Sequence, residues 1–199
     1  MFDLDRFRRA QDDPRAGIAT ALCELRSGQK TSHWIWYVFP QLAGLGQSPR
    51  AVHFGLLGSE EAVAYLRDPV LGERLVEAAA SVREQLGQGR ETRLEELMGS
   101  SIDALKLVSC MTLFQHVAKV GGSDSRPRFT CMANHADAIL AAAATQGYPR
   151  CAFTEEYLRR CDGTREASRV KALADSVEVT RPQSTRRSCV VGVPLDHLD

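Results

Sequence analysis

A ten-residue segment early in the chain, residues 32–41, carries residue types that often form a binding surface. It reads Ser-His-Trp-Ile-Trp-Tyr-Val-Phe-Pro-Gln and holds both tryptophans of the protein, Trp34 and Trp36. Aromatic side chains supply a large contact area, and the indole N–H adds directionality. His33 is a candidate acid or base, and Gln41 is a candidate for reading the edge of a base or an amide. The alternative is a densely packed core with a structural His33; in an extended segment, only one tryptophan would face a ligand.

A second candidate pair lies at residues 59–66, which read Ser-Glu-Glu-Ala-Val-Ala-Tyr-Leu. Glu61 and Tyr65 are four residues apart, so a helix would place them on one face. A carboxylate beside a phenol is suited to binding a ribose diol, or to proton transfer with Glu61 as general base. The alternative is structural, because acidic side chains in a first helical turn interact favourably with the helix dipole.

A third candidate group lies on a helix expected over residues 101–119, which is apolar almost all round and therefore predicted to be buried. Asp103, Lys106, Ser109 and Thr112 recur every third residue along it and form one polar stripe. Because buried charges are costly unless they are paired, this stripe faces solvent, pairs internally or lines a pocket. In a pocket, Lys106 would anchor a phosphate or carboxylate and Asp103 would hold it in place. Ser109 and Thr112 would then supply hydroxyl groups.

Several other kinds of site are not supported by the sequence. The Gly-Leu-Gly loop at residues 44–46 lacks the third glycine and the surrounding strands of a dinucleotide fingerprint. No phosphate-binding P-loop or nucleophile elbow is present, and none of the six cysteines falls in a C-x-x-C pair. We therefore expect no metal and no cofactor.

The composition limits the partners and the compartment. The formal net charge is zero and the pI is near 7, so no global field attracts nucleic acid or an acidic membrane. No apolar run approaches the roughly 20 residues that span a bilayer, and the N-terminus does not resemble a signal peptide. These features predict a cytoplasmic protein without a membrane partner.

The chemistry-bearing residues must be positioned by helices, because helical patterns dominate the sequence. Residues 34–39 read as one or two helical turns or a brief strand, and 51–57 as an apolar run of β character. Asp13-Pro14 and Asp68-Pro69 each combine a capping residue with proline in the first turn. Helices are expected over residues 2–11, 13–28, from 59, from 68 to about 86, from a capping box at 92–95, from a Ser101 cap to about 119, over 134–146 and over 154–160.

The fold class that follows is all-α or mainly α, with a single compact helical domain over residues 1–161. Residues 165–188 are polar and basic with little apolar periodicity, which predicts a disordered tail over residues 162–199.

The order of the motifs resembles domain-of-unknown-function family 1810, a group of small, mainly helical bacterial proteins. The resemblance is carried by Lys-Thr-Ser-His-Trp at 30–34, Phe-Pro-Gln at 39–41 and Gly-Leu-Gly at 44–46. It continues through Glu-Ala-Val-Ala-Tyr-Leu at 61–66 and Asp-Ala-Leu-Lys at 103–106. More distantly, the size, helical content and motif order are similar to those of the NADAR, or YbiA-like, proteins.

The distant resemblance implies hydrolysis of an N-glycosidic bond in a ribose phosphate, a nucleotide or an ADP-ribosylated base. Glu61 would then act at the anomeric carbon, Lys106 would bind a phosphate and Trp34 would stack on a base. The partner would be a small nucleotide or ribose-phosphate ligand, with nucleic acid entering only as a modified-base substrate. Two alternatives remain open at this point: a non-catalytic nucleotide-binding module, and a structural or protein-interaction domain.

Overall fold

The computed structural model describes residues 2–87, 92–120 and 127–162, and these ranges are helical without a β-strand. The predicted all-α class is confirmed for this part of the chain. Its extended backbone pairing amounts to one isolated parallel bridge between Leu42 and Leu56. The labelled helices are α1 (Asp5–Gln11), α2 (Ile18–Arg26), α3 (Ile35–Val38), α4 (Pro49–His53), α5 (Ser59–Arg67), α6 (Pro69–Gln85), α7 (Leu94–Met98), α8 (Ser101–Val120) and α9 (Pro127–Thr145).

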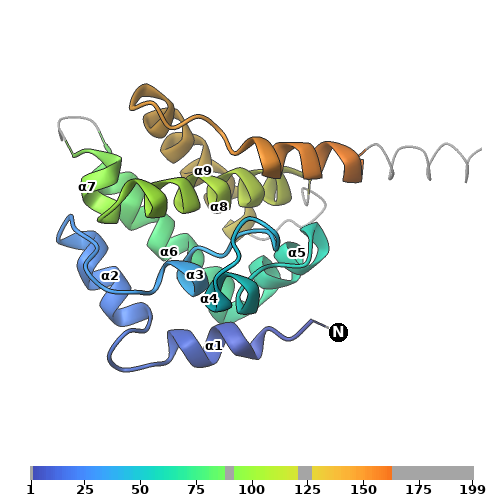
Figure 1. The fold of residues 1–199 in the computed structure, drawn as a ribbon, viewed down its shortest axis with the longest axis horizontal. Helices are drawn as coiled ribbons and strands as arrows, with labels where there is room; N and C mark the ends of the chain where they lie inside the picture. The colour runs from blue at the N-terminus through green and yellow to red at the C-terminus, as the bar shows by residue number, and fades with distance from the viewer. Residues whose placement is uncertain (1, 88–91, 121–126, 163–199) are drawn as a thin grey trace, which may run out of the picture. The chain divides into compact units, whose positions relative to one another are not determined.

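The longest helix, α8, crosses the middle of the bundle and positions much of the candidate chemistry (Figure 1). It packs on α9, α7 and α5, while α6 packs on α9, α2 and α5. A further helix at residues 152–162 follows α9 and runs beside one half of α8 (Figure 1). The described side chains enclose one apolar core, to which nearly every helix contributes.

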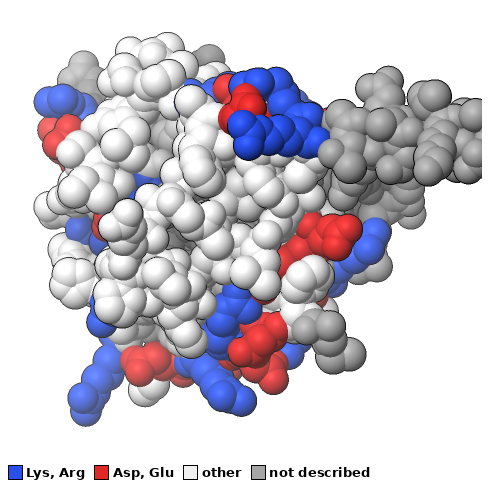
Figure 2. Space-filling model, turned by 45° about the vertical axis from the view of Figure 1, so that its right-hand side comes forward, with Lys and Arg blue, Asp and Glu red and all other residues white. Residues whose placement is uncertain are grey.

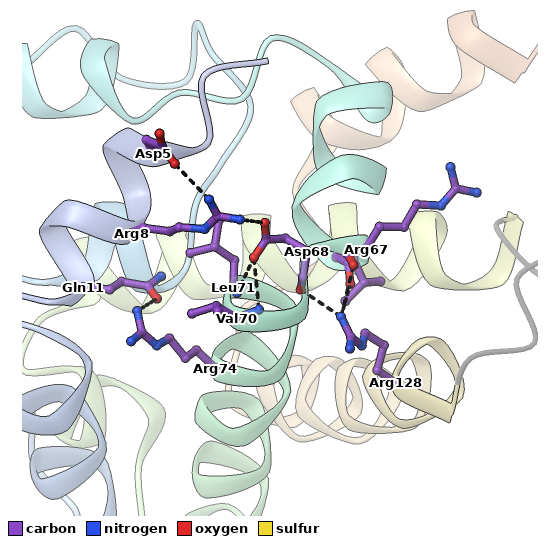
Figure 3. Close-up of polar contacts among 10 residues, drawn as sticks. Asp5, Arg8, Gln11, Arg67, Asp68, Val70, Leu71, Arg74 and Arg128 are labelled. Atoms are coloured by element: carbon purple, nitrogen blue, oxygen red, sulfur yellow. Dashed lines mark hydrogen bonds and ion pairs between the residues drawn. The ribbon is translucent and has the colours of Figure 1, made fainter. Parts of the chain in front are cut away.

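The N-terminus of α6 shows how a local signal and distant contacts combine. Asp68 accepts hydrogen bonds from the backbone N–H groups of Val70 and Leu71, each at 3.0 Å, so the predicted cap is confirmed. Its other carboxylate oxygen is bound by Arg8 of α1. Arg128 of α9 donates to the Asp68 carbonyl at 2.8 Å and to other carbonyls at the end of α5 (Figure 3). One aspartate therefore joins α1, α5, α6 and α9.

Several helix starts differ from the expected ones. Asp13 accepts hydrogen bonds from two N–H groups, both at 2.8 Å, but it caps only a turn, and α2 begins later, at Ile18. The predicted capping box at 92–95 is wrong, because α7 begins at Leu94 without a local side-chain cap. A distant residue takes that role: the Gln146 side-chain oxygen accepts from the Leu94 N–H at 2.6 Å.

The start of α8 is capped one residue earlier than expected, by Ser100, whose hydroxyl accepts from the Asp103 N–H at 3.1 Å. The apolar run at 51–57 is divided between α4 and the single bridge at Leu56, so its β character amounts to one residue pair. Helix α9 begins at Pro127, earlier than the expected 134.

The described ranges include no helix that is both long and apolar enough to cross a membrane. The described residues up to Arg160 group as one compact unit. The tail predicted at 162–199 lies, apart from its first residue, outside the described residues.

Candidate functional site

The aromatic segment is held in place by one carboxylate, Glu24 of α2, which the sequence reasoning did not single out. Glu24 accepts backbone N–H bonds from Thr31 at 2.9 Å and Ser32 at 3.1 Å. It also accepts from both of their hydroxyl groups and, at 2.7 Å, from the indole N–H of Trp34. Partial burial alone would raise the pKa of Glu24, but these five hydrogen bonds outweigh it and lower the pKa to about 2. The loop before α3 is therefore held by a carboxylate that is ionised at neutral pH.

The two tryptophans have different environments. Trp34 is fully buried, with its N–H on Glu24 and the Lys30 ammonium 5.3 Å from its ring centroid. Trp34 therefore has no exposed face on which a ligand could stack. It is a core residue, and the expected stacking on a base does not fit its position. Trp36 is half-buried and reaches the surface. Because α3 turns the chain between them, Trp36 is the tryptophan that is available to a ligand.

Trp36 lies beneath two cationic side chains. The Lys106 ammonium is 4.4 Å from the Trp36 ring centroid, and the Arg50 guanidinium carbon is 5.3 Å away. Cations at such distances are attracted by the negative face of the indole. Lys106, on the polar stripe of α8, therefore does lie against an aromatic side chain. That side chain is Trp36 of α3, and not Trp34, which was expected to contact the ligand.

Asp103 joins this cluster as a carboxylate shared between two lysines. It is 2.6 Å from the Lys30 ammonium and 2.8 Å from that of Lys106, one turn along α8. Partial burial would raise the pKa of Asp103, but the two lysines hold the pKa below its usual value. Lys30 and Lys106 thus share one carboxylate, while Arg50 and Lys106 both lie against the Trp36 ring. Two lysines and one aspartate give this group an excess of positive charge, although the chain as a whole is neutral.

A shallow depression adjoins this cluster. Its volume is about 10 Å³, roughly the space that one water molecule needs, and Trp36 and Gln41 belong to its wall. The Leu56 N–H donates to the Gln41 carbonyl at 2.8 Å, which fixes the backbone there. The Gln41 side-chain amide makes no hydrogen bond with any residue that the structure describes. The full lining is Trp36, Gln41, Leu42, Gly46, Ala51, Phe54 and Gly55.

Glu61, the expected catalytic acid or base, is buried with 1% of its surface exposed. One carboxylate oxygen accepts from the Leu57 N–H at 2.8 Å, in the loop before α5, and the other is 2.8 Å from Arg6. Arg6 also donates to the backbone carbonyls of His53 at 3.0 Å and Gly55 at 3.2 Å. Glu61 is therefore linked through Arg6 to a residue that lines the depression, but its carboxylate does not reach the surface there.

Tyr65 does not form a diol-binding pair with Glu61 at the surface, because it is completely buried. Its hydroxyl accepts from the Gln11 amide at 2.8 Å and donates to the Tyr37 carbonyl at 3.3 Å. Burial raises the pKa of the Tyr65 phenol well above its usual value. The side chain packs edge-on against Phe7, as a core residue does.

The polar stripe of α8 divides into two parts. Asp103 and Lys106 reach the surface, whereas Ser109 and Thr112 are buried. The Ser109 hydroxyl shares a hydrogen bond of 3.1 Å with that of Thr154, which comes from the helix at 152–162. Thr112 donates to the carbonyl one turn earlier in α8, at 2.8 Å. The stripe divides because the 152–162 helix covers only one half of α8.

The uncovered half of α8 also departs from the expectation that this helix is buried on all sides. Ile102 is 64% exposed and Leu105 is 53% exposed, directly beside Lys106.

His33 is also exposed, in the loop that Glu24 holds before α3. Its expected role as an acid or base stays a prediction.

Charge is not spread evenly over the surface. Figure 2 shows a face whose centre lacks Lys, Arg, Asp and Glu, while the charged side chains gather towards its edges. This face offers no broad basic surface of the kind that tracks a nucleic-acid backbone. Within residues 2–87, 92–120 and 127–162, no three His, Cys, Asp or Glu side chains come together as a metal site.

Among the residues of this cluster, the sequence reasoning identified Asp103, Lys106 and Gln41 as binding residues, but not Trp36, Lys30 or Arg50. One signal for Trp36 was available, because in an extended segment only one of the two tryptophans would face a ligand. The contact of Arg50 with Trp36 and the ion pair of Lys30 with Asp103 had no such signal, because neither joins neighbouring turns of one helix.

Comparison with known proteins gives a family but no activity. The sequence profile of a family described as "Protein of unknown function (DUF1810)" matches residues 1–129. The chain is also similar to a solved structure described as that of the conserved hypothetical protein Rv1873 from Mycobacterium tuberculosis. The identity is 38%, the match covers 77% of this chain and 94% of that one, and the TM-score is 0.57. No protein with a curated description matches. The family expected from the motifs is confirmed; the more distant similarity to the NADAR proteins is not shown.

Proposed function

The chain belongs to the DUF1810 family of proteins of unknown function, and from the geometry of its own residues we propose that it binds a nucleotide or a ribose phosphate. The observation that carries the proposal is a pair of lysines, Lys30 and Lys106, on the Asp103 carboxylate, with Lys106 and Arg50 both against the half-buried ring of Trp36. A phosphate would pair with the positive charge that Asp103 leaves unbalanced.

The cations are suited to this task in different ways. Lys106 is held from two sides, by Asp103 and by the Trp36 ring, so little side-chain entropy remains to be lost on binding. Arg50 is exposed and its guanidinium can offer two parallel N–H groups to a phosphate. Lys30 is buried, and it raises the local potential without needing to touch the ligand.

Binding without turnover is the form of this function that the geometry favours. Hydrolysis of an N-glycosidic bond requires a carboxylate that reaches the anomeric carbon. Glu61 is buried and paired with Arg6, and the oxygens of Asp103 are each bound by a lysine. Hydrolysis that depends on Glu61 therefore stays a prediction, to be tested by product formation in the wild type and in Glu61→Gln.

The first experiment measures thermal unfolding against ADP-ribose, AMP, GMP and ribose 5-phosphate. A ligand present at a hundred times its Kd stabilises the folded state by about 2.7 kcal/mol, which gives a clear rise in Tm. Lys106→Ala should weaken binding about tenfold or more, because it removes a charged contact to the phosphate. The matched control is Lys119→Ala, since Lys119 lies on the same helix but pairs with Asp137, away from Trp36.

The outcomes separate the three functions considered. A shift that is lost in Lys106→Ala and kept in Lys119→Ala supports the proposal, and its Kd should rise with salt concentration. Equal binding by both variants would overturn the assigned site. No shift with any of these ligands would refute nucleotide and ribose-phosphate binding and would favour the structural or protein-interaction alternative.

A further inference from the structure

We propose that residues 50–60 form a self-association surface, through which two copies of this chain pair about a twofold axis. Among the large apolar side chains that the structure describes, the most exposed are Leu57 at 75% and Val52 at 67%, and both belong to this segment. Single exposed apolar side chains are common on protein surfaces. Three further observations distinguish the segment: its scarcity of charge, its support from the interior, and the unpaired charges at its two ends.

The segment belongs to a long part of the chain that is almost free of charge. Arg50 is the only Asp, Glu, Lys or Arg in residues 31–59, although such residues make up 25% of the whole chain. Much of this part is exposed, including all of residues 47–50. Helix α5 lies at the right-hand side of Figure 1, and Figure 2 turns that side forward to show a face with an uncharged centre. Depletion of charged residues is typical of the centre of a protein–protein interface.

A buried ion pair supports the middle of the segment from the interior. Arg6 donates to the backbone carbonyls of His53 at 3.0 Å and Gly55 at 3.2 Å. Glu61, 2.8 Å from Arg6, accepts from the Leu57 N–H at 2.8 Å. The backbone that presents Leu57 is therefore ordered before any partner arrives, and an ordered segment loses less entropy on association. This support gives the buried Glu61 carboxylate a role at a binding surface without chemistry.

The charges at the two ends of the segment are opposite in sign and have no counter-ion. Arg50 is exposed in α4, and Glu60 is exposed in the first turn of α5. Neither forms an ion pair with a side chain in the described part of the chain; Arg50 lies against the Trp36 ring instead. In a twofold pair, any contact between two different residues of the two copies occurs twice. Arg50 of each copy then meets Glu60 of the other, and all four charges are paired.

A second copy fits this surface better than a charged partner does. The chain has no net charge, so two copies do not repel each other at long range. A nucleic acid or an acidic membrane would meet a single cation, Arg50, along residues 31–59. The Arg50 guanidinium has several N–H donors, so its contact with Glu60 of the other copy leaves donors for the phosphate of the proposed function.

The oligomeric state of the full chain tests the proposal. Sedimentation velocity at low and high micromolar concentrations should show a monomer that converts to a dimer as the concentration rises. Leu57→Glu should weaken this association by about a hundredfold, because it places a charge in the apolar contact twice in each twofold pair. Leu57 is mostly exposed, so the fold should tolerate the change, and a far-UV circular dichroism spectrum like that of the wild type would confirm this.

Ile102→Glu is the matched control for Leu57→Glu. Ile102 is 64% exposed, but it lies at the start of α8, outside residues 50–60. The control should dimerise as the wild type does. A wild type that stays monomeric at every concentration would overturn the proposal. So would a dimer that the two variants weaken equally or not at all, because the association would then use another face.

A charge exchange tests whether Arg50 and Glu60 meet across the pair. Arg50→Glu alone brings two carboxylates together at each contact, and Glu60→Arg alone brings two guanidinium groups together, so each variant should stay monomeric where the wild type dimerises. A mixture of the two variants restores opposite charges at both contacts and should form a mixed dimer. Only pairing between copies of this chain predicts that recovery. Single variants that dimerise like the wild type, or a mixture that stays monomeric, would refute the assigned contact.

Discussion

Replacement of Glu24 by glutamine should destabilise the protein in a way that depends on pH. The carboxylate receives five hydrogen bonds from Thr31, Ser32 and Trp34. Glutamine keeps one acceptor oxygen but turns an NH2 group towards donors that need an acceptor. The substitution therefore leaves some of these donors without a partner, and it removes the charge that strengthens the remaining bonds.

The pKa gives the size of the effect. The pKa of Glu24 falls from 4.5 to about 2 on folding, and each pKa unit corresponds to about 1.4 kcal/mol. This sets a ceiling of roughly 3 kcal/mol on its contribution to the free energy of unfolding. Because solvent reaches part of the side chain, we take about 2 kcal/mol as the expected cost of Glu24→Gln at pH 7.

The sign of the pH dependence follows from the lowered pKa. The folded state binds the Glu24 proton less tightly than the unfolded state, so the stabilisation is complete above pH 4.5 and is lost as the pH falls towards 2. Protonated glutamate resembles glutamine in its donors and acceptors. The difference between the wild type and Glu24→Gln should therefore shrink steadily from pH 5 to pH 3.

Urea unfolding at pH 7, 5, 4 and 3 measures this difference directly. The other carboxylates cancel in the comparison of the two proteins. Glu73→Gln is the control: it makes the same change on the exposed face of α6 and should alter the free energy of unfolding by less than about 0.5 kcal/mol at every pH. A cost of Glu24→Gln that stays constant down to pH 3 would refute the reasoning, since it would show that the charge is not what the five donors stabilise.

Three further substitutions test the contacts that position the site. Asp68→Ala should lower the free energy of unfolding by about 2 kcal/mol in urea titrations, because it removes the two-bond cap of α6; a loss below 0.5 kcal/mol would contradict that role. Gly99→Ala should lower the Tm by several degrees, because Gly99 has φ +74° and a Cβ there would lie 2.6 Å from the Lys30 carbonyl oxygen; an unchanged Tm would show that the loop relaxes freely. Ser109→Ala should cost about 1–2 kcal/mol by leaving the buried Thr154 hydroxyl unpaired, and simultaneous Thr154→Val should recover part of that loss.

Much of the helical structure could be predicted from neighbouring residues. The Asp68-Pro69 start of α6 and the run of apolar positions behind it are local properties, and the helix forms as expected. The Asp103–Lys106 pair is local in the same sense, because residues three apart on a helix are neighbours. The starts of α2 and α7 were less predictable. Asp13 caps a turn that precedes α2, so that helix begins later than expected. The cap of α7 comes from Gln146, which is distant in the chain.

The arrangement of the candidate site depended on contacts between distant parts of the chain. Glu61 matched the pattern of a catalytic carboxylate, but Arg6 from α1 pairs with it in the interior. Trp34 and Trp36 are equivalent by composition, and Glu24 of α2 decides which of them is buried by accepting the N–H of Trp34.

The sequence by itself determined the all-α class and the family. Each of these follows from residue types and from spacings within a few turns of helix, where the partners of a hydrogen bond or a side-chain contact are neighbours in the chain. Only the tertiary structure decided that Arg50 and Lys106 meet at Trp36 and that Lys30 pairs with Asp103. It also decided that the side chains of Glu61, Tyr65, Ser109 and Thr112 are buried. The reason is physical: burial and charge pairing depend on which helix faces pack together, and packing joins residues whose separation along the chain carries no local signal.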